Sequence, residues 1–95
     1  MKESQLQAKI LKDMAVRGIW AVKTIAMNRA GVMDIIGCTD GGRFIGIEVK
    51  LLKGKLSKLQ EVMLDRVNSR GGIAMVVYGW DDYVEKINAA VPPLN

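Results

Sequence analysis

Three charged residues near the middle of the chain have the types and spacing for metal-assisted chemistry: Asp34, Glu48 and Lys50. Glu48 and Lys50 lie two residues apart at the end of an apolar run, so a strand there would point both side chains to the same face. The β-branched residues that alternate with them would then face a core. Two carboxylates that meet, with a lysine alongside, can hold a hard divalent cation, because such ions prefer carboxylate and carbonyl oxygens.

The segment Asp40–Gly42 predicts the hairpin that would bring the two acids together. Asp-Gly-Gly between two apolar runs is a strong hairpin signal. Antiparallel pairing across this turn would place Asp34 close to opposite Glu48, because the spacing of 14 between them is centred near the turn. The pattern Asp…Glu-x-Lys also occurs by chance in basic proteins, where it marks an ion pair at a solvated strand end.

The residue types that the chain lacks exclude several classes of reaction. There is no histidine, and Cys38 is the single cysteine. These absences exclude Ser-His-Asp and Cys-His nucleophilic schemes, histidine general bases, and zinc sites built from histidine or several cysteines. An intrachain disulfide is also excluded, which favours a reducing cytosol. An enzyme of this composition would depend on carboxylates, lysines and a metal held by oxygen ligands.

The net charge of +4 is concentrated between residues 43 and 70, where seven basic residues meet three acidic ones. A run of lysines with no acid among them follows the candidate site: Lys53, Lys55 and Lys58. Arg29 lies in the loop that leads to Asp34. Lysine runs are typical of a solvated surface, but the place of this one directly after the candidate site favours contacts to a phosphate backbone at least as much. Arg29 could contact a phosphate as well, although an exposed loop arginine is more often only solvated.

Hydrophobic periodicity and turn residues predict the element order α-β-β-β-α-β-α. Outside the hairpin, the expected elements are a helix from Ser4 to about Arg17, a strand over Ile19–Ile25, a helix from Ser57 to about Ser69, a strand over Ile73–Gly79 and a helix from Asp81 or Asp82 to Ala90. The strand that begins at Ile73 is almost continuously apolar, which is typical of a central strand covered on both faces. The length predicts one domain over residues 1–95, and no apolar run is long enough to cross a membrane.

With these residues in this order, the chain resembles the PD-(D/E)xK nuclease superfamily and, within it, the VRR-Nuc type of domain. The resemblance spans most of the chain and rests on Glu3, Gly31-x-x-Asp34, Ile47–Lys50, Gly54-x-Leu56-Ser57 and Gln60. It implies a restriction-endonuclease-like α/β core, with a mixed sheet flanked by helices. The family usually has proline before the first aspartate, where this chain has Met33. Proline there stiffens the chain and ligates nothing, so the change concerns the rigidity of the turn.

The resemblance also implies a metal site. Asp34, Glu48 and the backbone carbonyl of Val49 would hold Mg²⁺ or Mn²⁺ as the cofactor. Lys50 would lie beside the attacking water and the phosphate. Arg29 and the lysines after the site would hold the DNA backbone.

Two further residues are assigned by the resemblance, and each has a structural alternative. Glu3 would be a third active-site acid, or else only a charge at the positive end of a helix capped by Ser4. Gln60 would lie near the metal and the scissile phosphate, or else only close a capping box with Ser57.

The expected function is therefore metal-dependent endonucleolytic hydrolysis of DNA. Stand-alone family members of this size resemble Holliday-junction resolvases and tend to pair, so the expected substrate is branched DNA and the expected state is a homodimer. The expected location is the cytoplasm of a bacterium or of a phage-infected host cell. The alternatives are a flap or nicking nuclease, a non-catalytic nucleic-acid-binding module, and a small subunit that docks its apolar surface on a larger partner.

Overall fold

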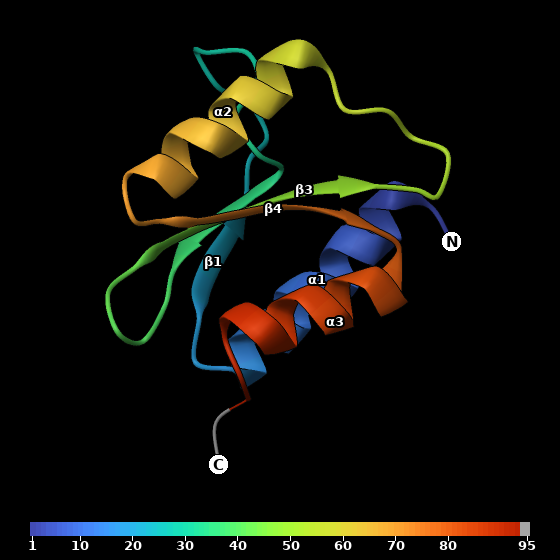
Figure 1. Ribbon diagram of the computed structural model, residues 1–95. Helices are drawn as coiled ribbons and strands as arrows, with labels where there is room; N and C mark the ends of the chain where they lie inside the picture. Colours follow the sequence, from blue (N-terminus) through green and yellow to red (C-terminus); the bar gives the residue numbers. More distant parts are fainter. Residues whose placement is uncertain (94–95) are drawn as a thin grey trace.

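The computed structural model describes residues 1–93 and confirms the predicted element order. The elements are α1 (Glu3–Val16), β1 (Trp20–Lys23), β2 (Ile35–Cys38), β3 (Phe44–Lys50), α2 (Lys58–Ser69), β4 (Ile73–Tyr78) and α3 (Trp80–Ala90). Figure 1 shows a sheet with α2 on one side and with α1 and α3 on the other. None of the helices within residues 1–93 is long and apolar enough to cross a membrane.

The sheet is mixed, with the strand order β1-β2-β3-β4. β1, β2 and β3 pair antiparallel, whereas β4 pairs parallel to β3 because α2 carries the chain back between them. The prediction of a central strand after Ile73 was wrong, because β4 lies at an edge of the sheet. Its apolar composition has another cause: α2 and α3 both pack on β4, one on each face.

The helix ends follow local signals at some positions and not at others. Gly18 and Gly71, with φ of 76° and 86°, follow the last residues of α1 and α2 and stop both helices. α1 is not capped by Ser4: it begins at Glu3, and Gln5 Oε1 accepts the Lys2 N–H at 2.8 Å. α3 is not capped by an aspartate either, since its N-cap is Gly79 with φ of 92°.

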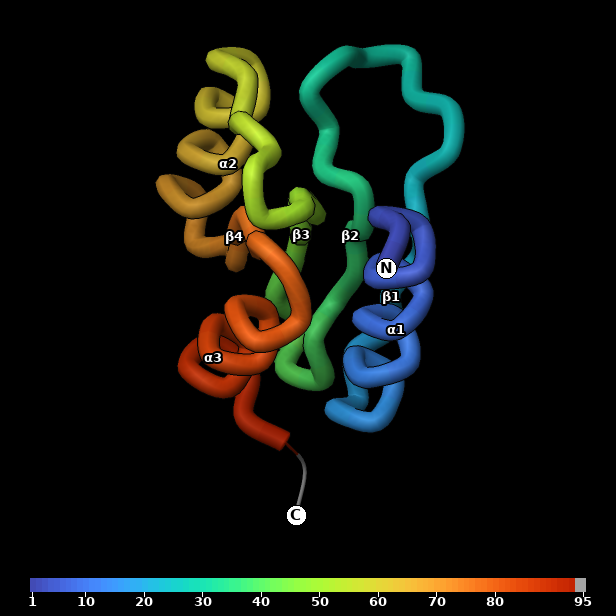
Figure 2. Tube along the Cα trace, turned by 90° about the vertical axis from the view of Figure 1, so that its right-hand side faces the viewer, coloured from blue at the N-terminus to red at the C-terminus, as the bar shows by residue number. Residues whose placement is uncertain are grey.

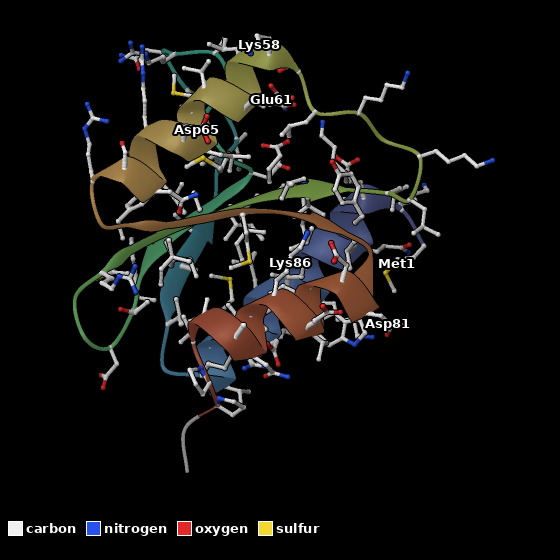
Figure 3. All side chains as sticks on the ribbon, viewed as in Figure 1. Met1, Lys58, Glu61, Asp65, Asp81 and Lys86 are labelled. Carbon is white, nitrogen blue, oxygen red and sulfur yellow. The ribbon has the colours of Figure 1, made fainter. Side chains whose placement is uncertain are left out.

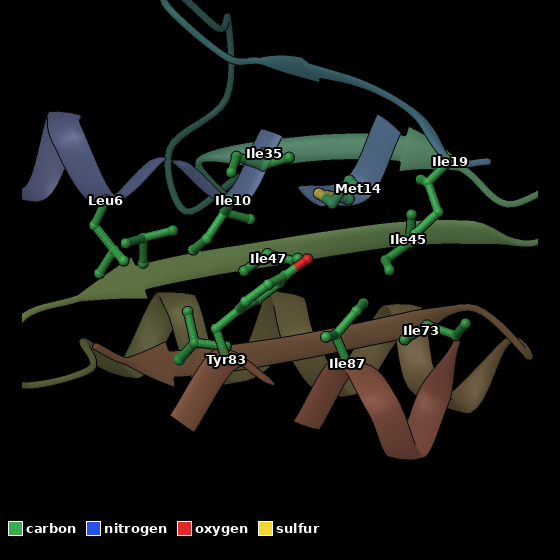
Figure 4. Close-up of a cluster of buried hydrophobic side chains, with 12 residues drawn as sticks. Leu6, Ile10, Met14, Ile19, Ile35, Ile45, Ile47, Ile73, Tyr83 and Ile87 are labelled. Atoms are coloured by element: carbon green, nitrogen blue, oxygen red, sulfur yellow. The ribbon is translucent and has the colours of Figure 1, made fainter. Parts of the chain in front are cut away.

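The core lies on the sheet face that α1 and α3 cover. Side chains of the two helices meet the inward residues of β2, β3 and β4 in one cluster (Figure 4): Leu6, Ile10, Met14, Ile19, Ile35, Ile45, Ile47, Val49, Ile73, Val77, Tyr83 and Ile87. The inward residues of β3 are 0% exposed, as their alternation predicts. Because this face is filled, Glu48 and Lys50 must point to the side where α2 lies.

A buried polar group fixes α1 against α3. Asp13 Oδ2 accepts hydrogen bonds from Tyr83 Oη and from Arg17 Nε, both at 2.6 Å. Arg17 Nη1 also donates to Asn88 Oδ1 at 2.7 Å. Burial, with the adjacent Asp13, raises the pKa of the Tyr83 hydroxyl, so it stays a donor. These contacts hold the two helices on one face and leave the opposite face to the site.

Candidate active site

The hairpin between β2 and β3 aligns the two acids. Ile35 pairs with Ile47, so the next position outward sets Asp34 opposite Glu48. The turn is closed by Thr39, which receives the Gly42 N–H on its carbonyl and the Arg43 N–H on Oγ1, at 2.9 and 3.0 Å. The prediction that the two acids lie close to opposite one another is confirmed.

Asp34 is held in place by the backbone on both sides. Its Oδ2 accepts the Val49 N–H at 2.8 Å. Its own carbonyl accepts the Thr24 N–H from β1's side at 2.8 Å. Because these contacts fix both the main chain and the carboxylate, Asp34 is aimed at the end of β3 without needing the proline that Met33 replaces.

Glu48 is a buried acid, and one of its carboxylate oxygens receives no hydrogen bond within residues 1–93. It is 3% exposed, and its Oε2 accepts Gln60 Nε2 at 2.9 Å while Lys50 Nζ lies 3.6 Å away. Its Oε1 is buried and has no hydrogen-bond partner among the described residues. Burial raises the pKa of Glu48 to about 7; the neighbouring Asp34 carboxyl adds to the rise, and Lys50 opposes it.

Gln60 makes the capping contacts expected of it and also contacts Glu48. Its Oε1 accepts the Ser57 N–H at 2.9 Å, and Ser57 Oγ accepts the Gln60 N–H at 3.1 Å, which completes the capping box of α2. Its Nε2 remains free for Glu48. One side chain therefore starts α2 and ties it to the site.

Comparison with known proteins identifies the family. The family model described as the VRR-NUC domain matches residues 2–81. The chain belongs to the VRR-NUC domain family. A solved structure described as a VRR_NUC domain is 23% identical and superposes with a TM-score of 0.77, covering 92% of this chain and 94% of the other; at that identity it supports the fold. No curated protein matches the sequence. VRR-NUC domains are in general nuclease domains, which implies a nucleic-acid substrate.

The site of this VRR-NUC domain suits a hard cation on its own geometry. Asp34 and Glu48 converge, and the unpartnered Glu48 Oε1 is the kind of buried oxygen that a cation would satisfy. Within residues 1–93 no group of three or more acid, cysteine or histidine side chains gathers around one point. Two carboxylates are therefore available there, and the remaining ligands would be carbonyl, water and phosphate oxygens.

α1 brings its polar residues to different places in the VRR-NUC domain. Glu3 is exposed in the first helical turn, where it complements the helix dipole, and the structure does not gather it with Asp34 and Glu48 into a three-acid cluster. Gln7, one turn later, is 6% exposed, and its Oε1 is buried without a partner. Sequence reasoning gave Gln7 no role at the site, although a polar residue beside Leu6 and Ile10 on a buried helix face was the available signal.

The basic residues predicted to contact DNA are all on the surface. Lys53, Lys55 and Lys58, called the loop lysines below, are exposed at and after the end of β3. Lys58 is paired with Glu61 at 3.7 Å on the exposed side of α2 (Figure 3). Arg29 is exposed in the segment between β1 and β2. Their roles, like those of the acids, stay predictions, and the structure shows where they lie.

Proposed function

We propose that this VRR-NUC domain is a metal-dependent endonuclease that hydrolyses DNA phosphodiester bonds. The observation that carries the proposal is the alignment of Asp34 and Glu48 across the hairpin, with an unpartnered oxygen on Glu48 and with Lys50 on the same strand face. A solvated ion pair would leave the acid exposed and its oxygens in water, whereas Glu48 is buried.

The proposed ligands of Mg²⁺ or Mn²⁺ are Asp34, Glu48 and the Val49 carbonyl. When bound, the ion supplies a water of lowered pKa and positive charge for the phosphoryl oxygens. Asp34 enters this role already oriented by the Val49 N–H. Glu48, whose carboxyl group has a pKa raised by burial to about 7, would release any proton that it holds when the cation binds.

Lys50 and Gln60 complete the site around the two acids. The side chain of Lys50 is 18% exposed and lies 3.6 Å from Glu48 Oε2, so its ammonium is available to the attacking water and to the charge that develops on phosphate. Gln60 holds the Glu48 carboxyl in place. The loop lysines and Arg29 would bind the phosphate backbone without reading bases. Glu3 would act from outside the pair, through water.

The proposed substrate is branched DNA, including Holliday junctions, and the proposed assembly is a homodimer in the cytoplasm. Large apolar side chains on the edge strand β1 support association of two copies: Trp20 is 68% and Val22 40% exposed. The one cysteine, Cys38, is free, which suits a reducing compartment. Light scattering across a concentration series would show a mass of two chains.

A panel of end-labelled substrates tests the function: a four-way junction, a flap, a blunt duplex and a single strand, each with Mg²⁺, Mn²⁺ or EDTA. The proposal expects cleavage with either metal, none in EDTA, and a preference for a branched substrate. Cleavage that persists in EDTA would overturn the metal dependence. Tight binding of every substrate without cleavage under any condition would favour the non-catalytic binding module instead.

A further inference from the structure

An open groove of about 400 Å³ lies between α2 and the segment that precedes β2. Its lining is mainly apolar and carries three exposed arginines. We call it the arginine groove, and its relevant residues are Arg29, Met33, Phe44, Met63, Arg66 and Arg70. Figure 2 shows α2 and the β1–β2 segment projecting to the same side of the sheet. Glu48 points to that side as well, because the residues that alternate with it in β3 are buried in the core on the other face.

The basic and acidic side chains of α2 lie on different sides of the helix. Met63, Arg66 and Arg70 recur at spacings of three and four, so they share the face that borders the groove. Glu61 and Asp65, both labelled in Figure 3, lie on another side of the helix. The groove therefore carries positive charge with no acid of α2 to neutralise it.

The arginines of the groove are available to a ligand. None of the four ion pairs found within residues 1–93 involves Arg29, Arg66 or Arg70. Arg70 uses Nη1 to donate to the Arg66 carbonyl at 2.9 Å, which holds its side chain along the helix end. Exposed guanidinium groups without carboxylate partners are suited to bidentate contacts with phosphate.

The groove adjoins the candidate active site. Met33 immediately precedes Asp34 in the chain, and the backbone at Gly31 is so close to α2 that an added Cβ would lie 2.7 Å from Leu59 Cγ. At the other end, a second hollow that shares Phe44 and Arg70 continues the groove toward β4. The rise of α2 from Met63 to Arg70 is about 10 Å, the length of about three stacked nucleotides.

We propose that the arginine groove binds an unpaired strand of the nucleic acid next to the cleavage site. The arginines would contact successive phosphates, and Phe44, which is 42% exposed, would stack with Met63 against a base. In a duplex the base faces are covered by their neighbours, so an apolar floor beside phosphate-binding groups favours a single strand. The inference rests on the proposed function for its substrate, and it adds that the groove holds a strand that is unpaired at the branch point, as in a flap.

A second copy of the chain is a poorer occupant. A two-fold interface through the groove would set each arginine cluster against its own image, since such an interface uses the same patch on both copies. Like charges brought together in this way repel. Phosphate supplies the opposite charge, and a base supplies the apolar face.

Fluorescence anisotropy in EDTA tests the proposal without depending on cleavage, with a labelled twelve-nucleotide thymidine strand and a blunt twelve-base-pair duplex as the probes. The double variant Arg66→Gln, Arg70→Gln should weaken single-strand binding about tenfold and flatten its plot of log affinity against log salt by roughly 0.7 per lost contact. Binding of the duplex should change by less than about twofold. Phe44→Leu should weaken single-strand binding about fivefold, the lower end of stacking energies, without altering the salt slope.

The matched control removes two charges from the opposite side of the sheet. The double variant Lys12→Gln, Lys23→Gln has the same change in net charge and should leave single-strand binding within about twofold of the original. It weakens the overall positive field as the groove variant does, but it removes no contact in the groove. Equal losses in the two double variants, or equal losses on strand and duplex, would overturn the groove assignment. So would a measured mass that falls from two chains to one in the groove variant, which would make the groove an interface between copies.

The two proposals can fail separately. If the protein cleaves DNA with a metal but the groove variants bind the single strand as the original does, the groove proposal is wrong and the nuclease proposal stands. If the groove variants selectively lose single-strand binding but the original protein cleaves no substrate, the groove proposal stands and the nuclease proposal is wrong.

Discussion

Replacing Glu48 with glutamine should stabilise the metal-free protein at alkaline pH. The folded pKa of about 7 exceeds the ordinary value of 4.5, so the folded state binds the proton more tightly than the unfolded state. The free energy of unfolding therefore falls as pH rises from about 4.5 through 7, and the loss is complete above that range. Glutamine keeps the shape and carries no charge, so the variant avoids this loss.

The size of the effect follows from the shift of the pKa. The difference between about 7 and 4.5 corresponds to on the order of 3 kcal/mol at pH 8, falling to below about 1 kcal/mol at pH 5. The glutamine amide can also donate a hydrogen bond to the neighbouring Asp34 carboxylate. For a domain of this size, 3 kcal/mol raises the midpoint of thermal unfolding by roughly 12–24 °C.

Thermal unfolding followed by circular dichroism in EDTA, from pH 5 to pH 9, measures this difference. Glu85→Gln, on the exposed side of α3, is the matched control and should shift the midpoint by little at any pH. Added Mg²⁺ should stabilise the original protein at pH 8 and the Glu48→Gln variant much less. A Glu48→Gln protein that is less stable at pH 8, or whose difference from the original is the same at every pH, would refute the assignment of Glu48 as a buried acid with a raised pKa.

Three further changes separate the roles around the site. Lys50→Ala should keep Mn²⁺ binding in a calorimetric titration but lower the cleavage rate at saturating DNA roughly a hundredfold or more; an unchanged rate would contradict its role in the reaction. Gln60→Glu should keep the start of α2, because a carboxylate can still accept the Ser57 N–H. It should lower the free energy of unfolding at pH 8 by about 1–3 kcal/mol, because the donor to Glu48 is lost. A variant as stable as the original would argue against this contact. Alanine at all three loop lysines should weaken duplex binding on every sequence and flatten the salt dependence by about 0.9 per lost contact; an unchanged slope would place the DNA elsewhere.

The elements closest to the chemistry could be predicted because their signals are local. A glycine-rich turn and a spacing centred on it suffice to set Asp34 opposite Glu48, and the capping box of α2 is contained in Ser57–Gln60. Each of these features is decided by residues that are neighbours in the chain or across one hairpin, where steric and hydrogen-bonding rules act directly.

Other features depend on packing between distant segments. The apolar run of β4 indicates that both faces of the strand are covered. It contains no information about which strands lie beside β4, so the edge position of the strand was not predicted. The arginine groove unites Arg29, Phe44 and Arg66 from three separate segments, which no spacing in the sequence connects. The burial of Gln7 in place of Glu3 depends on the rotation of α1 against the sheet.

The most direct test of the central claim measures metal binding and cleavage in the same samples of Asp34→Asn. This change removes one ligand charge and keeps the shape of the side chain, while Asp40→Asn, in the exposed hairpin turn, makes the same change away from the site. Asp34→Asn should lose both Mn²⁺ binding, measured by calorimetric titration, and single-turnover cleavage of a labelled four-way junction. Asp40→Asn should retain both. Cleavage by Asp34→Asn at the original rate and the original metal concentration would contradict the claim that Asp34 and Glu48 hold the catalytic metal.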